Sequence, residues 1–139
     1  MTPPDEVKAG LVRQWLAKGE EDLGLARHIV EHDVPFLNAA GFHAQQAVEK
    51  SLKAYLVWVQ VTFPKTHDLG SLLKVLAVSD YRLAHSIEET VQITDYAVEI
   101  RYPGDVPPLA IEEASAAVDI ATNACLKIKA ALEAAGFSS

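Results

Sequence analysis

The chain has 139 residues, of which 50% are apolar and 22% are charged. This length and composition fit one globular domain spanning residues 1–139 and exclude a disordered or fibrous chain. The formal net charge of −7 disfavours indiscriminate binding to duplex DNA, because such binding needs a basic surface. The single cysteine excludes an intramolecular disulfide and a cysteine-rich zinc site.

The sequence also bears on where the protein works. Its uninterrupted apolar runs are far shorter than the roughly 20 residues that cross a bilayer. The N-terminus, Met-Thr-Pro-Pro-Asp-Glu, has neither the basic start nor the apolar stretch of a signal peptide. We therefore expect a cytoplasmic protein in a reducing compartment, with no membrane contact.

Prolines and glycines divide the first half of the chain into two long segments with apolar residues at helical spacing. The first predicted helix covers about residues 6–32 and ends before Pro35, because a residue before proline is pushed out of the helical region. The second predicted helix begins near Asn38, a suitable N-cap, and extends to about Val61.

Two further helices are expected before the second proline cluster. A short helix covers about residues 68–77, with Asp68 as its cap. The pair Ser79-Asp80 then caps a fourth helix that extends to about Arg101. In an antiparallel bundle, we expect the N-terminus of the short helix to lie near the C-terminal end of the second helix.

The last helix has the clearest pattern. Pro108 fits its first turn, and Gly136 supplies its C-terminal stop. Its apolar positions recur in steps of three and four, and most of them are small enough for close helix packing. They are Ile111, Ala114, Val118, Ala121, Cys125, Ile128, Leu132 and Ala135. We predict an all-α, up-and-down four-helix bundle with one extra short helix, and its high apolar content favours a homodimer.

Familiar catalytic and metal-binding motifs are absent from the sequence. It contains no glycine-rich phosphate loop, no His-Glu-x-x-His helix and no Gly-x-Ser-x-Gly elbow. Cys125 lies in the apolar stripe of the last helix, which is typical of a small buried thiol and not of a nucleophile. We therefore predict no cofactor and no metal site.

Positive charge is concentrated in one segment. Between His43 and Lys74 there are four lysines and two acidic residues, giving +2, so the rest of this −7 chain carries −9. A locally basic spot on an acidic body suits one compact anionic ligand better than a long nucleic acid. The alternative is that these lysines only solvate helix faces.

The basic segment includes a polar face on the second predicted helix. Gln46, Lys50 and Lys53 share one side of that helix, and Glu49 precedes Lys53 by four residues in the favourable order. Glutamine amides both donate and accept hydrogen bonds, as a base edge or a neighbouring backbone requires. The alternative here is a polar contact between two helices.

Two loops offer the remaining donors for an anion. Lys65-Thr66-His67, at a helix N-terminus, provides charge, a hydroxyl, an imidazole and free backbone N–H groups. Arg101 and Tyr102 add a bidentate donor and a stacking surface. The predicted nucleotide- or anion-binding residues are Lys50, Lys53, Lys65, His67, Arg101 and Tyr102. The alternative is that His67 and Asp68 cap a helix and Tyr102 packs.

These segments resemble the HEPN (higher eukaryotes and prokaryotes nucleotide-binding) domain family. The resemblance covers about residues 8–135 and implies a helical bundle that commonly forms homodimers. It also implies a frequent neighbour, a minimal nucleotidyltransferase, and for some members a role as the toxin of a toxin–antitoxin pair. Its three motifs are Phe42-His43-Ala44-Gln45-Gln46-Ala47-Val48-Glu49-Lys50-Ser51-Leu52-Lys53-Ala54, Thr66-His67-Asp68-Leu69 and Arg101-Tyr102-Pro103-Gly104-Asp105.

Many toxins of this family are metal-independent ribonucleases with an Arg-x(4–6)-His signature, in which histidine is a candidate general base and arginine stabilises the phosphorane. Here no histidine follows His85, so Arg101 lacks that partner. The leading hypothesis is therefore a non-catalytic or weakly catalytic nucleotide- or RNA-binding module. The competing hypotheses are a ribonuclease that uses His67 or His43 near Arg101, and a purely structural helical dimer.

Overall fold

The computed structural model of the protein describes residues 3–32, 35–97 and 108–139, and every regular element in these ranges is a helix. None of these helices is long and apolar enough to cross a membrane. The elements are α1 (Pro3–Glu31), α2 (Leu37–Trp58), α3 (Leu69–Ser79), α4 (Tyr81–Ser86), the 3-10 helix η1 (Glu88–Ala97) and α5 (Ile111–Ala134). The predicted all-α bundle is confirmed.

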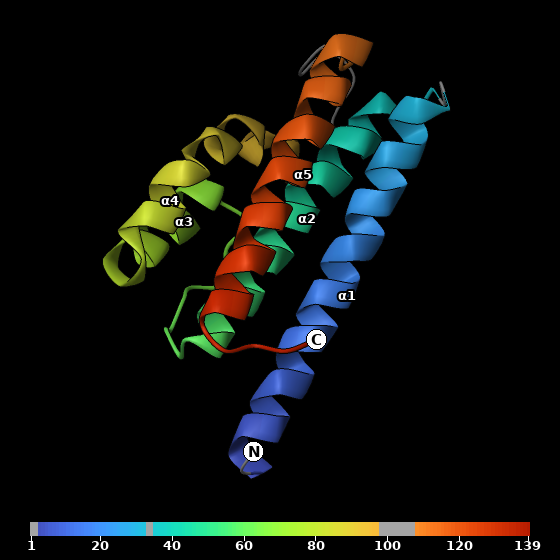
Figure 1. Ribbon diagram of the computed structural model, residues 1–139. Coiled ribbons are helices and arrows are strands. Elements are labelled where there is room, and N and C mark those ends of the chain that lie inside the picture. Colours follow the sequence, from blue (N-terminus) through green and yellow to red (C-terminus); the bar gives the residue numbers. More distant parts are fainter. Residues whose placement is uncertain (1–2, 33–34, 98–107) are drawn as a thin grey trace.

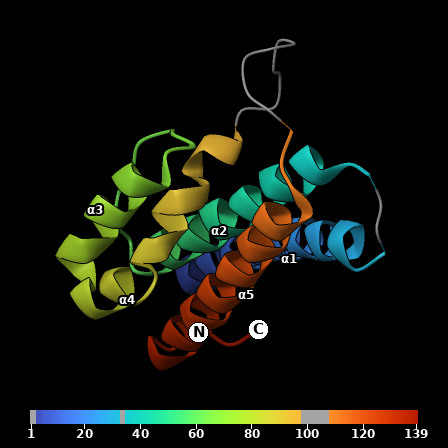
Figure 2. The ribbon, with the colours of Figure 1, turned by 90° about the horizontal axis from the view of Figure 1, so that it is seen from above.

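Helix α2 forms the centre of the bundle. It lies between α1 on one side and α3, α4 and η1 on the other, and α5 packs along it (Figures 1 and 2). Most α2 residues from Ala40 to Leu56 are buried. A helix that is buried on nearly every side needs small or apolar residues all round, or polar residues that are paired. The polar residues of α2 must therefore find partners inside the protein.

Small residues allow the three long helices to approach one another closely. A Cβ atom on Gly19 of α1 would lie 3.3 Å from the Ala47 carbonyl oxygen and 3.3 Å from Ser51 Oγ, both on α2. On α5, Ala114 and Ala121 of the predicted stripe are buried inside this same chain. Ala117 and Ala124, which the prediction did not include, are buried beside them. The small-residue face is thus occupied within the bundle and is not a free surface for a second subunit.

Three of the predicted helix ends are confirmed. The Asp68 side chain accepts a hydrogen bond of 3.0 Å from the Gly70 N–H at the start of α3. The Asp80 side chain accepts one of 3.0 Å from the Leu83 N–H at the start of α4. Gly136 follows α5 with a φ of 95°, the left-handed conformation that glycine adopts readily.

Two other predicted ends were wrong. Asn38 does not cap α2, which begins at Leu37; its Oδ1 instead accepts a hydrogen bond of 2.8 Å from the Leu109 N–H, tying the two helix starts together. Pro108 lies before α5 and not in its first turn, because the helix begins at Ile111.

The predicted long fourth helix was also wrong. After α4 ends at Ser86, the chain continues as the tighter helix η1. Hydroxyl groups contribute to this change, because Ser86 Oγ donates to the Leu83 carbonyl and Thr90 Oγ1 donates to the Ile87 carbonyl. Such local bonds compete with the α-helical ladder, and the β-branched residues here are poor helix formers. The predicted end at Arg101 lies outside the described residues.

The segment between α2 and α3 turns back along α2. Gln60 adopts a φ of 60°, and the Val61 N–H donates to the Leu56 carbonyl at 2.9 Å, which closes a Schellman-type cap. The chain then brings His67 to within 2.8 Å of Glu49, which lies nine residues before the end of α2. The N-terminus of α3 therefore lies beside the middle of α2 and not near its C-terminal end, as the sequence had suggested.

Candidate nucleotide-binding site

A buried carboxylate, Glu49, organises one end of the candidate site. Its side chain is only 4% exposed, and its Oε2 accepts a hydrogen bond of 2.9 Å from Lys53 Nζ. Its Oε1 lies 2.8 Å from His67 Nδ1. Both carboxylate oxygens are thus paired, which a buried charge requires. Glu49 joins α2 to the segment that leads into α3.

Two neighbouring glutamines complete this Glu49 cluster. Gln45 Nε2 donates to the His67 carbonyl oxygen at 2.8 Å, and Gln46 Nε2 donates to Gln45 Oε1 at 2.6 Å. Both glutamines are buried. Their amides therefore bind a neighbouring backbone group and each other. The sequence had left two roles open for these glutamines, recognition of a base edge and a polar contact within the protein, and the structure shows the second.

Lys53 belongs to the interior of the protein. The residue is 7% exposed, and its ammonium nitrogen lies 5.7 Å from the Trp15 ring centroid and 5.9 Å from that of Phe63. The two rings and the Glu49 carboxylate stabilise its charge. Lys53 is thus held inside the Glu49 cluster and is not open to solvent.

His67 is the exposed member of the Glu49 cluster. Its side chain is 69% exposed, although its Nδ1 contacts the buried Glu49. Because a carboxylate accepts hydrogen bonds, this contact places the imidazole proton on Nδ1 and leaves the lone pair on Nε2. The result is an oriented imidazole at the surface, next to the start of α3.

The backbone N–H groups at the start of α3 are not free, contrary to the prediction. The Leu69 N–H donates to Thr94 Oγ1 at 2.8 Å, and the Gly70 N–H donates to Asp68. Hydrogen bonds from Ser71 Oγ and from the Gly70 N–H lower the pKa of Asp68 below its usual value. The carboxylate of Asp68 already occupies the place that an anionic ligand would take.

A second buried carboxylate, Asp22, lies between α1 and α2. Its Oδ1 lies 2.8 Å from His43 Nδ1, and its Oδ2 accepts a hydrogen bond from Lys50 Nζ. The Asp22 side chain is 11% exposed, against 23% for that of Lys50. Sequence reasoning missed this Asp22 cluster. The available signal was the position of Asp22 on the buried face of α1, three residues after Gly19 and four before Ala26.

The six predicted site residues thus fall into four groups. Lys53 and His67 meet at Glu49, and Lys50 lies in the Asp22 cluster. Lys65 is exposed in the segment before α3. Arg101 and Tyr102 lie outside the described residues, so the complete site stays a prediction.

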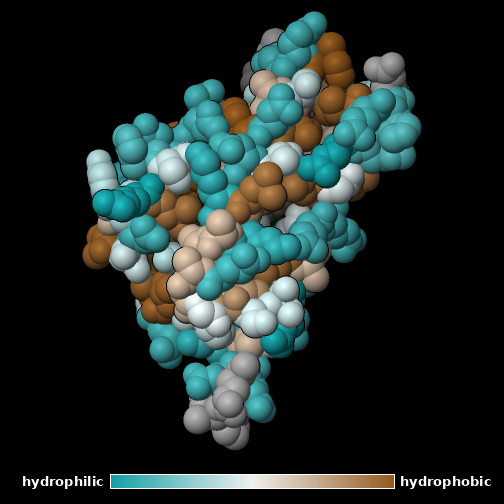
Figure 3. Space-filling model, viewed as in Figure 1, coloured by the Kyte–Doolittle hydropathy of each residue, from teal (hydrophilic) through white to brown (hydrophobic). Residues whose placement is uncertain are grey.

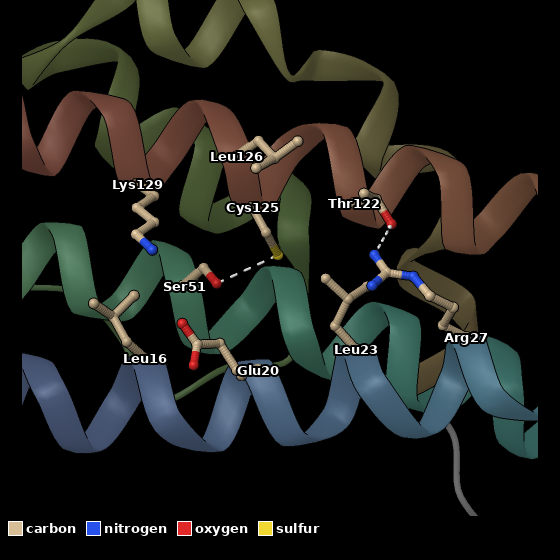
Figure 4. A pocket seen from close by; sticks show the side chains of 10 residues that line it. Leu16, Glu20, Leu23, Arg27, Ser51, Thr122, Cys125, Leu126 and Lys129 are labelled. Carbon is tan, nitrogen blue, oxygen red and sulfur yellow. Dashed lines mark hydrogen bonds between the residues drawn. The ribbon is translucent and has the colours of Figure 1, made fainter.

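A groove lies between α1 and α5 (Figure 4). It has a volume of about 230 Å³, and Ser51 Oγ lies on its floor, 3.4 Å from Cys125 Sγ. Burial raises the pKa of the Cys125 thiol, so this thiol stays protonated at neutral pH. Among the described residues, no group of three or more histidine, cysteine, aspartate or glutamate side chains could hold a metal ion.

The family model of the HEPN domain matches residues 12–131. The chain belongs to the HEPN domain family. No curated protein and no solved structure matches it at a significant level. Family membership makes the chain a module of the nucleotide- or RNA-related kind.

In this HEPN domain, the motif residues of α2 form the two buried clusters. His43 and Lys50 bind Asp22, while Gln45, Lys53 and His67 surround Glu49. Much of the motif therefore fixes the bundle and orients one exposed imidazole. The motif side chains that remain accessible to a ligand are those at the edges of the Glu49 and Asp22 clusters, such as the His67 imidazole.

The first testable prediction concerns Glu49. Replacing it in Glu49→Ala leaves the Lys53 ammonium buried without its carboxylate, and we expect the free energy of unfolding to fall by about 3–5 kcal/mol. Urea denaturation followed by circular dichroism measures this change. The exposed Glu21→Ala in α1 is the control and should change stability by no more than about 0.5 kcal/mol. Equal effects of the two substitutions would contradict the structural role of Glu49.

Proposed function

We propose that this HEPN domain is a nucleotide- or RNA-binding module that is non-catalytic or only weakly catalytic. The observation that carries the proposal is the His67 imidazole, 69% exposed yet oriented by the buried Glu49. The exposed Nε2 of an imidazole held in this way accepts a hydrogen bond from a base or a ribose hydroxyl, or donates one to a phosphate when it carries a proton, with little loss of side-chain entropy on binding. Lys65, exposed two residues earlier, adds positive charge beside it.

We further propose that the module works with a minimal nucleotidyltransferase, as in a toxin–antitoxin-type pair, in the cytoplasm. This proposal rests on the family alone. A small nucleotidyltransferase encoded in the neighbouring reading frame would support it. Its absence would favour the purely structural dimer.

A specific observation also favours the competing function, a metal-independent ribonuclease. The Glu49–His67 pair leaves Nε2 as a proton acceptor exposed to solvent, which is the arrangement of a general base. His43 is a weaker candidate, because its side chain is only 26% exposed and its Nδ1 binds Asp22. A ribonuclease would also need a group that stabilises the phosphorane, and Arg101 is the candidate.

A homodimer remains part of the proposal, with the α1–α5 groove as its interface. Leu126 of α5 is 65% exposed at this groove, which is also lined by Leu16 and Leu23. Apolar side chains are visible between hydrophilic ones on this face of the molecule (Figure 3). Glu20 and Lys129 line the same groove from α1 and α5, so two copies related by a twofold axis can pair opposite charges.

The nucleotide-binding prediction is tested with AMP and ATP. We expect both to bind the wild-type protein, and Arg101→Ala to lose about 1.5–3 kcal/mol, or roughly ten- to a hundredfold in affinity, through one charge-assisted contact. Calorimetric titration measures the affinities, with His85→Ala as the control. Equal affinities in all three proteins would remove Arg101 from the site. If no protein bound either nucleotide, the structural dimer would be the better account.

The ribonuclease alternative is tested with single-stranded RNA in the absence of metal ions. We expect the purified protein to leave the RNA largely uncut, because the usual histidine after Arg101 is missing. Gel analysis of the RNA measures cleavage. Cleavage that disappears in both His67→Ala and Arg101→Ala would establish the ribonuclease instead.

The homodimer is tested by light scattering at micromolar concentrations. We expect a dimer for the wild type and a monomer for Leu126→Asp, because the substitution places a charge in the apolar interface. The control is Val78→Asp, at a position on α3 that is 92% exposed. A monomeric wild-type protein would remove the homodimer from the proposal.

A further inference from the structure

A second groove lies between α1 and α2. Its lining residues are Leu11, Gln14, Trp15, Lys18 and Lys50, and its volume is about 290 Å³. We propose that this groove binds one nucleotide unit, with the base stacked on Trp15 and the phosphate on Lys18. The inference rests on the proposed function and names the place where the nucleotide lies.

Trp15 supplies the stacking surface. Its side chain is half-buried and packs against the hydrophobic core, so the ring is fixed while part of it lines the groove. The Lys53 ammonium lies 5.7 Å from the ring centroid, which also holds the indole in place. A base that stacks on a pre-positioned aromatic ring gains affinity without an ordering cost on the protein side.

Two lysines supply the positive charge. Lys18 is exposed on α1 and makes no hydrogen bond or ion pair with any part of the chain that the structure describes. Lys50 is held by Asp22, whose other oxygen contacts His43. The charges of Lys18, Lys50 and the Asp22 carboxylate give the groove a net charge of +1, whereas the whole protein carries −7. Lys18 is therefore the cation available to a phosphate.

The volume and the remaining polar group of the groove set the size of the ligand. The groove volume of about 290 Å³ is close to the lower limit of about 300 Å³ for ligand sites in proteins, which suits a ligand no larger than one nucleotide unit. Gln14 is exposed at the groove, and its amide can pair with a base edge. The α1–α5 groove also has two cations, Arg27 and Lys129, against Glu20, but none of its lining residues is aromatic, so it has no ring on which a base could stack.

The groove is connected to the exposed imidazole of the proposed function. Lys53 contacts the Trp15 ring on one side and Glu49 on the other, and Glu49 binds His67. Trp15 in the groove and the exposed His67 imidazole are thus linked through the buried Lys53 and Glu49 side chains.

The experiment uses the fluorescence of Trp15. The chain has two tryptophans, so Trp58→Phe leaves Trp15 as the reporter. AMP, ATP and a short oligouridylate are titrated into this variant, and we expect each bound ligand to quench the emission by stacking. Affinities are then measured by calorimetry for Trp15→Leu and Lys18→Ala, with the exposed Lys74→Ala on α3 as the matched control. Thermal unfolding verifies that each variant is folded.

The possible results separate this inference from the proposed function. We expect Trp15→Leu and Lys18→Ala each to weaken binding by at least about tenfold, while Lys74→Ala matches the wild type. If the wild type binds and both variants bind equally well, without quenching of Trp15, the groove is not the site and the proposed function stands. If the wild type binds none of the three ligands, both the inference and the proposed function fall.

Discussion

The pairing of Glu49 with Lys53 is the interaction on which the centre of this HEPN domain depends. A carboxylate and an ammonium that are both nearly inaccessible to water cost free energy unless each is paired. Here Glu49 binds Lys53 through one oxygen and His67 through the other, and Gln45 fixes the His67 backbone. Because His67 lies just before α3, the pairing also positions that helix beside the middle of α2. Breaking it would release a buried charge and the segment that leads into α3 together.

The same logic applies to Asp22, which connects α1 to the other side of α2. Asp22 binds His43 and Lys50, which lie on a different face of α2 from the Glu49 cluster. A central helix surrounded by neighbours can carry this many polar residues only because two acids, one from α1 and one of its own, satisfy them. The positive charges that the sequence concentrates on α2 are therefore largely neutralised inside the protein. Among the described residues, Lys18 and Lys65 are exposed cations that lie outside these two clusters.

The sequence predicted the helical fold well, because the helix signals are local. Asp68, Asp80 and Gly136 act at the ends where capping chemistry placed them. The errors arose where contacts between residues distant in the sequence determine the structure. Asn38 accepts a hydrogen bond from the Leu109 N–H and does not cap its own helix. The turn at Gln60 directs the chain back along α2. The site was harder to predict for the same reason. Nothing local to Lys53 shows that Trp15 and Phe63 enclose it, or that Asp22 neutralises Lys50.

An oriented imidazole does not by itself decide between binding and catalysis. The contact with Glu49 orients His67 as a general base requires, but it equally holds the ring in place as a hydrogen-bonding group for a ligand. Catalysis needs in addition a donor that meets the charge developing on the phosphorane, held close to the base. Lys53, the cation nearest to Glu49, is buried and already paired, so it cannot supply that donor. The proposed binding needs only groups that the described residues present, namely an aromatic ring, an unpaired lysine and an exposed imidazole, whereas the ribonuclease also depends on Arg101, which lies outside them.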